Sequence, residues 1–214
     1  MKFNIVVSLN NHNLIGENDD LLIHSKKDLK NFQKITTEGE HRNIVIMGYK
    51  TWLSIPESKR PLKDRLNIVL SRNHSIEEND NTKLFRSLDE AFAFTKELKG
   101  EVFVIGGSQI FNECCKNEYY QYLYKIYVTK FDDNYHPRDT THSFPIQLFK
   151  NMKCVETSDK IHEMCSRPHI DNQPKSFIQE YLSETYTKSI TFTFNIYQNL
   201  NTINTDEYQY LNLL

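Results

Sequence analysis

Short apolar runs alternate with helix-forming segments along most of this chain, and this alternation restricts the fold more than any other feature. The longest runs are candidate strands and cover residues 3–9, 44–47, 66–70, 102–105, 123–128 and 190–197. Apolar runs of this length are typical of strands that are buried on both faces of a sheet. Strands that alternate with helices predict an α/β fold with a mostly parallel central sheet and helices on both faces.

The ends of two helices and one sheet edge can also be predicted. Ser25 with Asp28, and Ser87 with Glu90, have the spacing of helix-capping pairs, and we expect the second helix to stop at Gly100. The last two apolar runs have no helical pattern between them, so they predict an antiparallel edge at the C-terminal side of the sheet. The polar segment from about Cys165 to Lys175 is predicted to be a surface loop.

Composition excludes several classes of protein. The 214 residues carry a net charge of −2 with both signs interspersed, which argues against nucleic acid or a membrane surface as a partner. No stretch approaches the ~20 apolar residues of a membrane span. Neither the four cysteines nor the eight histidines have the spacing of a metal site. We therefore expect free thiols, no bound metal and a cytoplasmic location.

A glycine pair, Gly106 and Gly107, stands where the strand of "VFVIGGSQIF" turns into a helix. Glycine is used where the backbone needs a positive φ or where another group approaches closely. A helix start offers free N–H groups to an anion such as phosphate. A tight turn that binds nothing would have the same sequence, and the pair alone does not decide between them.

Asp28 lies at the edge of the stripe that Leu29, Phe32 and either Ile35 or Thr36 form on one predicted helix. One interpretation is a solvated acid that caps the helix. The other is a partly buried carboxylate that faces a pocket, where a ligand with paired N–H donors would bind it. Helix geometry leaves both open.

Four motifs, in order and in register, decide what the chain resembles. They are "NLIGENDDLLI", "IVIMGYKTWLSIP", "RPLKDRLNIVLSR" and "VFVIGGSQIF". From about Phe3 to Gln198 the chain closely resembles dihydrofolate reductase. The resemblance implies that family's fold and its NADPH-dependent reduction of 7,8-dihydrofolate to 5,6,7,8-tetrahydrofolate. Hydride would be transferred to C6, and N5 would gain a proton from water.

The resemblance also implies a substrate site that antifolates would share. Asp28 would bind the 2-amino group and N3 of the pterin, Thr129 would bond that acid, and Leu21 would lie on the mobile loop beside them. Arg65 would take the carboxylate of the glutamate tail, a role that suits the fork of a guanidinium group. The implied substrate-binding residues are Val6, Val7, Phe32, Ile55, Leu62 and Arg65.

For the cofactor, the resemblance implies NADPH lying against a cis peptide bond between Gly106 and Gly107. Lys50 and Thr51 would bind its phosphates, and Ser71 and Arg72 would hold the adenosine 2′-phosphate. The implied cofactor-binding residues are Ser8, Ile15, Gly16, Gly48, Lys50, Thr51, Ser71, Arg72, Ile105, Gly106, Gly107, Ser108, Gln109, Ile110 and Phe111.

Three residues depart from the family pattern. Ile23 stands where the mobile loop usually has tryptophan, Phe111 where a tyrosine is common, and Tyr49 where a basic residue often binds phosphate. Two alternatives therefore stay open. One is a related reductase of another pterin or pyrimidine, against which the pairing of Asp28 with Arg65 argues. The other is a catalytically silent homologue, which only the missing tryptophan supports.

The C-terminal segment suggests a second domain. Residues 1–199 would be the reductase, and residues 200–214 a linker and the start of a truncated thymidylate synthase domain, whose first helix "DEYQYLNLL" resembles. Tyr210, Leu213 and Leu214 have helical spacing. The fragment would be a monomer or weak dimer, and the full-length chain a homodimer through the synthase domain. A natural terminus folded back on the reductase is the alternative.

Overall fold

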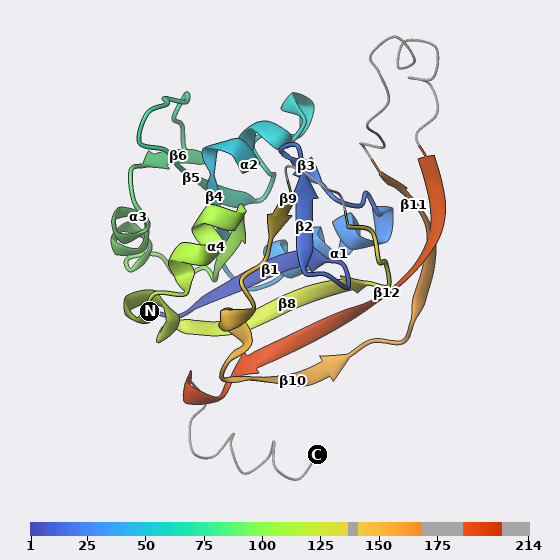
Figure 1. Ribbon diagram of the computed structural model, residues 1–214. Coiled ribbons are helices and arrows are strands. Elements are labelled where there is room, and N and C mark those ends of the chain that lie inside the picture. The colour runs from blue at the N-terminus through green and yellow to red at the C-terminus, as the bar shows by residue number, and fades with distance from the viewer. Residues whose placement is uncertain (137–140, 168–185, 203–214) are drawn as a thin grey trace.

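The computed structural model describes residues 1–136, 141–167 and 186–202. Within them the main sheet has the strand order β10-β12-β8-β1-β7-β4-β5-β6, with β11 also paired to β12 (Figure 1). A small second sheet has the order β3-β2-β9. The strands are β1 (Phe3–Leu9), β2 (Leu14–Glu17), β3 (Asp20–Leu21), β4 (Asn43–Gly48), β5 (Arg65–Leu70), β6 (Thr82–Phe85), β7 (Val102–Gly106), β8 (Leu123–Phe131), β9 (Thr141–Ser143), β10 (Met152–Thr157), β11 (Ile161–Arg167) and β12 (Tyr186–Asn199).

The strand pairing confirms the predicted α/β sheet. All six apolar runs are strands, and β1 is parallel to β7 and β8, as β4 is to β5 and β7. The predicted antiparallel edge is confirmed as well, since β12 runs antiparallel to β8, β10 and β11.

Helices cover both faces of the sheet, with α1 behind it and α4 in front of it in Figure 1. The helices are α1 (Lys26–Thr37), α2 (Tyr49–Ser54), α3 (Leu88–Thr95), α4 (Ser108–Cys114) and α5 (Asn117–Tyr120), with short 3-10 turns at Glu57–Lys59, Ile146–Phe149 and Leu200–Thr202. Strand β4 shows why two cores form. Ile44 and Ile46 pack on the face of α3 and α4, whereas Val45 and Met47 pack on the face with Trp52 of α2. Successive side chains of a strand point to opposite faces.

The predicted end of the second helix is wrong. α3 begins after the Ser87 cap as expected but ends at Thr95, not at Gly100. The glycine has another role, because a Cβ at Gly100 would lie 1.9 Å from the carbonyl oxygen of Arg42. Gly100 therefore allows two backbone segments to approach closely rather than ending a helix.

The predicted core stripe of α1 is wrong at Leu29, whose side chain is 48% exposed. The buried residues of the helix are Asp28 and Thr36. They are eight residues apart and share a helix face with Phe32, whereas Leu29 lies about 100° around the helix axis from Asp28. Of the two alternatives for the end of the stripe, the structure buries Thr36, so the buried face of α1 is partly polar.

The predicted surface loop starts too early. Cys165 to Arg167 belong to β11, and Cys165 is only 1% exposed. The remainder of that loop, like the C-terminal segment after Thr202, lies outside the described residues. The predicted free thiols are confirmed for all four cysteines.

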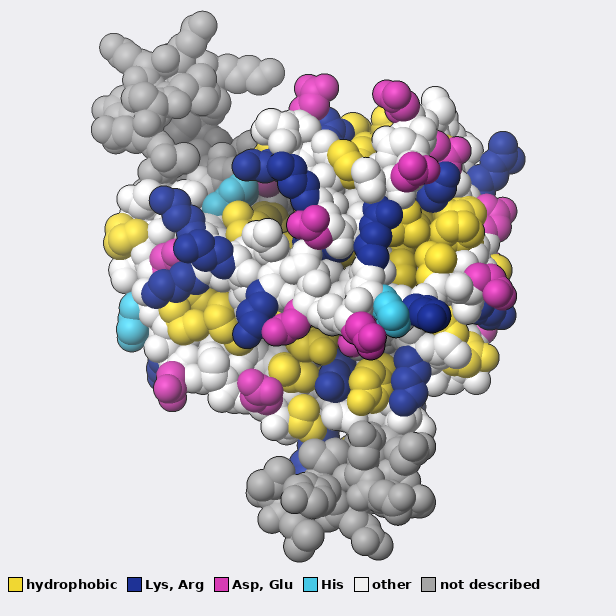
Figure 2. Space-filling model, turned by 180° about the vertical axis from the view of Figure 1, so that it is seen from behind, with side chains coloured by type: hydrophobic (Ala, Val, Ile, Leu, Met, Phe, Trp, Pro, Cys, Tyr) yellow, Lys and Arg dark blue, Asp and Glu magenta, His cyan; other side chains and the backbone are white. Residues whose placement is uncertain are grey.

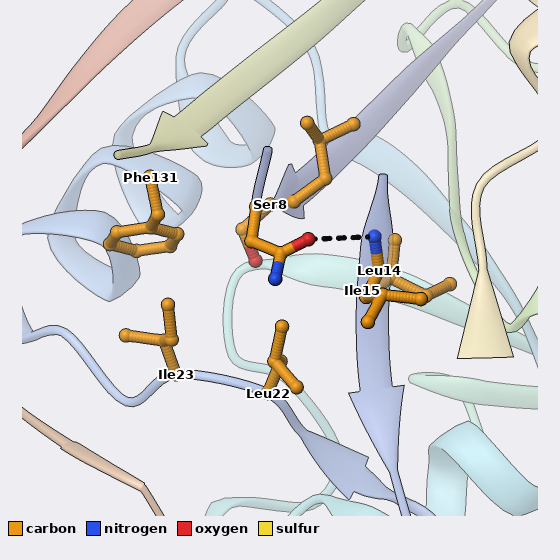
Figure 3. A pocket seen from close by; sticks show the side chains of 8 residues that line it. Ser8, Leu14, Ile15, Leu22, Ile23 and Phe131 are labelled. Carbon is orange, nitrogen blue, oxygen red and sulfur yellow. Dashed lines mark hydrogen bonds between the residues drawn. The ribbon is translucent and has the colours of Figure 1, made fainter. Parts of the chain in front are cut away.

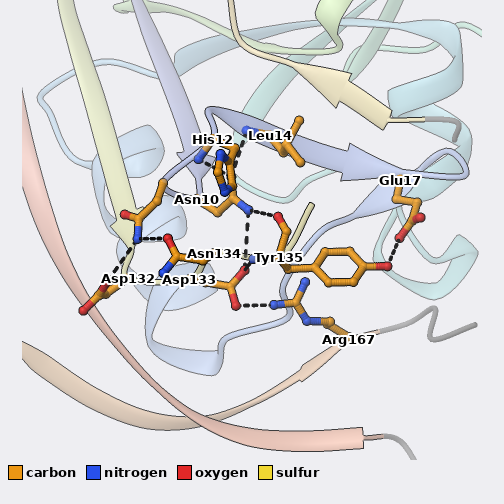
Figure 4. Close-up of polar contacts among 10 residues, drawn as sticks. Asn10, His12, Leu14, Glu17, Asp132, Asp133, Asn134, Tyr135 and Arg167 are labelled. Atoms are coloured by element: carbon orange, nitrogen blue, oxygen red, sulfur yellow. Dashed lines mark hydrogen bonds and ion pairs between the residues drawn. The ribbon is translucent and has the colours of Figure 1, made fainter. Parts of the chain in front are cut away.

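A buried polar cluster fixes the segment after β8 against the turn between β1 and β2 (Figure 4). Arg167 Nη2 donates to Asp133 Oδ1 at 2.5 Å, and its guanidinium carbon lies 4.0 Å from the centre of the Tyr135 ring. Asn10 Nδ2 donates to the Tyr135 carbonyl at 2.7 Å, and the Tyr135 hydroxyl donates to Glu17 of β2 at 3.2 Å. These bonds hold β2 beside the end of β1.

On the surface, acidic and basic side chains are interspersed over the face shown in Figure 2. None of the helices in the described part of the chain has both the length and the apolar character to cross a bilayer.

Candidate active site

The polar centre of the site is Asp28, in the first turn of α1. Its side chain is 8% exposed, and its Oδ1 accepts a hydrogen bond from Thr129 Oγ1 at 2.5 Å. Its backbone N–H donates to Ser25 Oγ at 3.0 Å. Of the two interpretations of Asp28, the geometry matches the buried carboxylate, because the side chain turns away from the helix end toward β8.

Burial raises the pKa of Asp28 from its ordinary 3.8 to about 6, because desolvation disfavours the charged form. Hydrogen bonds from Thr129 and Ser8 oppose the rise, since they stabilise the carboxylate, and the nearby charge of Glu163 adds to it. The group is therefore mostly ionised at pH 7, and it titrates close to that pH.

Strand β1 contributes to this site from one face only. Ser8 pairs with Thr129 in the register of β1 and β8, and it hydrogen-bonds Asp28. Val6 lies on the same face and packs against the core cluster of Val45 and Met47. Val7 points the other way and packs in the core cluster that contains Phe111. Of the two valines expected to line the substrate pocket, the structure thus places only Val6 on the face of Asp28.

Three of the other expected substrate residues gather near β4 and β5. Ile55 and Leu62 pack against the core cluster of Val45 and Met47. Phe32 of α1 lies under Arg65, whose guanidinium carbon is 5.7 Å from the ring centre. Leu29, adjacent to Asp28, exposes an apolar side chain and is a further candidate to contact the substrate, which the sequence pattern assigned to the core.

Arg65 is 4% exposed although it carries a charge. Its Nη1 donates to Thr36 Oγ1 at 2.7 Å, and its Nε donates to the Lys63 carbonyl at 2.8 Å. In residues 1–136, 141–167 and 186–202 no carboxylate forms an ion pair with it. Burial lowers the pKa of Arg65, and Asp64 partly offsets this. A buried cation of this kind favours an anionic ligand.

The glycine pair that the sequence left open adopts the geometry expected from the resemblance. The peptide bond between Gly106 and Gly107 is cis, so that prediction is confirmed, and Gly106 has a φ of +120°. A Cβ at Gly107 would lie 3.1 Å from Thr51 Oγ1, and one at Gly48 would lie 3.4 Å from Ile110. The ends of β4 and β7 thus approach each other through glycine backbone.

The expected cofactor residues share one edge of the sheet. Ser8, Gly48 and Gly106 lie near the carboxyl ends of strands that run parallel, and Ser71 directly follows another. Ligands of open α/β sheets bind at this edge. The remaining residues follow in sequence, with Ile105 in β7 and Ser108, Gln109, Ile110 and Phe111 in α4.

The β2–β3 segment lies over the end of β1. Ile15 and Ser8 line a narrow pocket together with Leu22, Ile23 and Phe131 (Figure 3). Gly16 pairs with Leu21 of β3, and Leu21 is only partly buried.

Lys50 forms an ion pair with Asp19, in the turn between β2 and β3. Its Nζ lies 3.2 Å from Asp19 Oδ1, and 75% of its side chain is exposed. An exposed ion pair is worth about 0–1 kcal/mol, so an incoming anion could replace Asp19 at low cost.

A groove of about 630 Å³ opens beyond the end of β5, and Ser71 and Arg72 line it as expected. Arg86 lines the same groove, although no sequence pattern singled it out. It directly precedes the Ser87 cap, and only the folded sheet brings β5 and the end of β6 side by side. Two arginines facing one groove favour a doubly charged anion.

In the described ranges, no three His, Cys, Asp or Glu side chains are grouped so that they could hold a metal ion.

The family of the chain follows from comparison with known proteins. The family model described as "Dihydrofolate reductase" matches residues 2–171. The chain belongs to the dihydrofolate reductase family. The dihydrofolate reductase of Candida albicans is 30% identical over 178 residues, which cover 79% of this chain and 81% of that protein.

Two further relatives are similar to this chain over part of their own length. The dihydrofolate reductase of Sus scrofa is 43% identical over 120 residues, 51% of this chain and 64% of the relative. The bifunctional dihydrofolate reductase-thymidylate synthase of Acanthamoeba polyphaga mimivirus is 33% identical over 178 residues, 77% of this chain and 29% of the relative. The chain thus spans less than two thirds of the length of these two relatives.

Each departure from the dihydrofolate reductase pattern has a structural counterpart. Ile23 is 2% exposed and packs in a core cluster with Phe131. Phe111 is also buried, and a Cβ at Gly106 would lie 3.5 Å from its ring. Tyr49 stacks on His74 with ring centres 4.3 Å apart. Ile23 and Phe111 therefore fill buried apolar positions, and Tyr49 fills a stacked one.

Proposed function

We propose that this chain catalyses the reduction of 7,8-dihydrofolate to 5,6,7,8-tetrahydrofolate. The observation that carries the proposal is Asp28, a buried carboxylate held by Thr129 at the carboxyl edge of the sheet, with buried Arg65 as a second charged anchor. Membership of the family and the reductases among its relatives support the same activity.

The two anchors fit the two ends of the substrate. The pterin presents an N–H and an amino group side by side, and a carboxylate can accept both. Arg65 would bind the carboxylate of the glutamate tail, because a guanidinium group pairs bidentately with carboxylates. Phe32, Ile55, Leu62 and Leu29 would contact the rings between them, as apolar side chains do in ligand pockets.

NADPH fits the remaining residues, and when bound it supplies the hydride. Gly48, Gly106 and Gly107 have no side chains at this edge of the sheet, so a flat group could lie directly against their backbone. Ser71, Arg72 and Arg86 would hold the 2′-phosphate, and Lys50 and Thr51 the other phosphates.

The chain's own contribution is position and charge. Asp28 would orient the pterin, and its negative charge would favour proton gain at N5 from water. Leu22 and Ile23 are 5% and 2% exposed, so apolar side chains border the pocket by Ser8 and limit water there. Holding reactants in one geometry is the main catalytic effect available to a protein whose cofactor carries the chemistry.

A spectrophotometric assay tests the proposal. We expect NADPH oxidation that depends on dihydrofolate, yields tetrahydrofolate and is inhibited by antifolates. A protein that binds NADPH but leaves dihydrofolate unchanged would contradict it, and turnover of another pterin or a pyrimidine instead would favour a related reductase.

Removing one guanidinium group tests the cofactor groove. We expect Arg72→Ala to raise the KM for NADPH about 10-fold or more and to change that for NADH little, since a charge-assisted hydrogen bond is worth about 1.5–3 kcal/mol. Arg86→Ala should raise the KM for NADPH in the same way, again with little change in the KM for NADH. Lys96→Ala, an exposed cation at the end of α3, is the matched control. Equal losses with NADPH and NADH would assign the 2′-phosphate to other residues.

We further propose that residues 1–199 are the reductase domain of a bifunctional enzyme and that residues 200–214 begin its connection to thymidylate synthase. The 178-residue similarity to the mimivirus bifunctional protein supports this. The full-length protein would be a cytoplasmic homodimer formed through the synthase domain. We expect the genomic reading frame to continue past Leu214 into a synthase sequence, and a stop codon directly after Leu214 would contradict the proposal.

A further inference from the structure

Strand β11 reaches across to the start of α1. The backbones of His24 and Ser166 exchange two hydrogen bonds, with N···O distances of 2.7 and 3.1 Å. This bridge brings Glu163, three residues before Ser166, against the first turn of the helix. Its carboxylate accepts from Ser25 Oγ and from the backbone N–H of Lys27, at 3.3 Å to Oε1 and 3.2 Å to Oε2.

Ser25 connects Glu163 to Asp28. Ser25 is only 1% exposed. Its hydroxyl group donates a hydrogen bond to the Glu163 carboxylate and accepts one from the backbone N–H of Asp28. A helix-capping serine that is itself bonded by a carboxylate cannot rotate freely. The position of Asp28 in the first turn of α1 therefore depends on a residue of β11, 135 positions along the chain from Asp28.

We propose that Glu163 is a positioning residue for Asp28, which fixes Ser25 and the first turn of α1 so that the Asp28 carboxyl group faces Thr129. This rests on the proposed function, since it takes Asp28 as the group that binds the pterin. A carboxylate at a helix N-terminus is also favoured by the positive end of the helix dipole, so Glu163 suits this place electrostatically.

The charge of Glu163 has a second effect on Asp28. In the described part of the chain, Ser8 of β1 and Thr129 of β8 hydrogen-bond Asp28, and Glu163 and Cys165 of β11 interact with it electrostatically. Burial raises the pKa of Cys165 to about 11, so this thiol is neutral near pH 7. Glu163 is then the charged group among them, and like charge disfavours ionisation of Asp28. The ammonium group of Lys27 is directed to the His162 carbonyl instead, at 3.2 Å.

Two substitutions separate position from charge. In Glu163→Gln the amide oxygen can still accept from Ser25, but the charge is lost. We expect a KM for dihydrofolate within about 2-fold of wild type and an Asp28 pKa lower by about 0.5 unit, as expected for a screened charge several ångströms away. In Glu163→Ala both are lost, and we expect KM to rise about 5-fold or more with a smaller change in kcat, since a hydrogen bond to a charged group is worth about 1.5–3 kcal/mol.

The Asp28 pKa is measured in two ways, from the pH profile of kcat/KM and from an NMR titration of the labelled carboxyl carbon in the ligand-free protein. Glu156→Gln, an exposed glutamate of β10, is the matched control for the loss of one charge. If wild type fails to reduce dihydrofolate, the proposed function fails, whereas the NMR titration still tests the link between Glu163 and Asp28. A KM for dihydrofolate that is unchanged in Glu163→Ala would overturn the inference. So would an Asp28 titration that is unchanged in both Glu163 variants, or one that shifts equally in Glu156→Gln.

Discussion

Asp28→Asn is expected to lower kcat/KM for dihydrofolate about 10²- to 10³-fold at pH 7, since a group that assists a proton transfer typically contributes about 10²- to 10⁴-fold. An asparagine still accepts from Thr129, so the change removes the charge and keeps the shape. Part of the rate should return as the pH falls, because the substrate then gains its proton from solution. Steady-state kinetics across pH measure this, and a rate near wild type at pH 7 would contradict the role of Asp28.

The same substitution is expected to stabilise the ligand-free protein. Folding raises the pKa of Asp28 from 3.8 to about 6. The folded state thus binds the proton more tightly than the unfolded state. The stability from this proton is complete below pH 3.8 and is lost as pH rises through about 6. One pKa unit corresponds to 1.36 kcal/mol, so the loss above pH 6 is about 2–3 kcal/mol.

Asparagine does not titrate and avoids this loss. We therefore expect the free energy of unfolding of Asp28→Asn to exceed that of wild type by about 1–3 kcal/mol at pH 8 and to approach it near pH 4. Denaturant unfolding at both pH values measures the difference. A variant that is less stable than wild type at pH 8 would show that the buried charge is better compensated than its burial indicates.

Arg65→Lys is the second large effect that we expect. Lysine keeps the charge but lacks the planar fork, so the KM for dihydrofolate should rise about 10- to 100-fold while kcat changes little, because bidentate pairing with a carboxylate is lost. A reduced pterin without the benzoylglutamate tail has no carboxylate for Arg65, and its KM should stay unchanged. This comparison of two substrates distinguishes tail binding from general damage to the site.

Arg42→Lys is the matched control for that experiment. Arg42 lies next to Arg65, since its Nη2 donates to the Arg65 carbonyl at 3.0 Å, but its side chain bonds Asn81 and the backbone rather than facing the site. If Arg65→Lys weakens both substrates equally, the Thr36 and Lys63 bonds of Arg65 are its main role, and another cation binds the tail.

The sequence by itself determined the class of fold, the antiparallel edge of the sheet and the starts of two helices. Local patterns suffice for this, because burial on both faces makes a strand apolar throughout, and a capping pair marks a helix start. The same local rules failed at Leu29 and Gly100. The exposure of Leu29 depends on which side of α1 packs on the sheet, and the need for glycine at position 100 depends on how closely the Arg42 backbone approaches it. Neither is determined by residues that are neighbours in the sequence.

Only the tertiary structure decided the state of Asp28. Whether the carboxyl group caps α1 in water or is buried against Thr129 depends on β8, 101 positions away in the chain, and on Glu163 of β11. The same holds for Arg86, which joins Arg72 only because β5 and β6 are paired. Desolvation and charge act through space, and residues distant in sequence set both, so the pKa of Asp28 and the groove beyond the end of β5 become visible only in the folded chain.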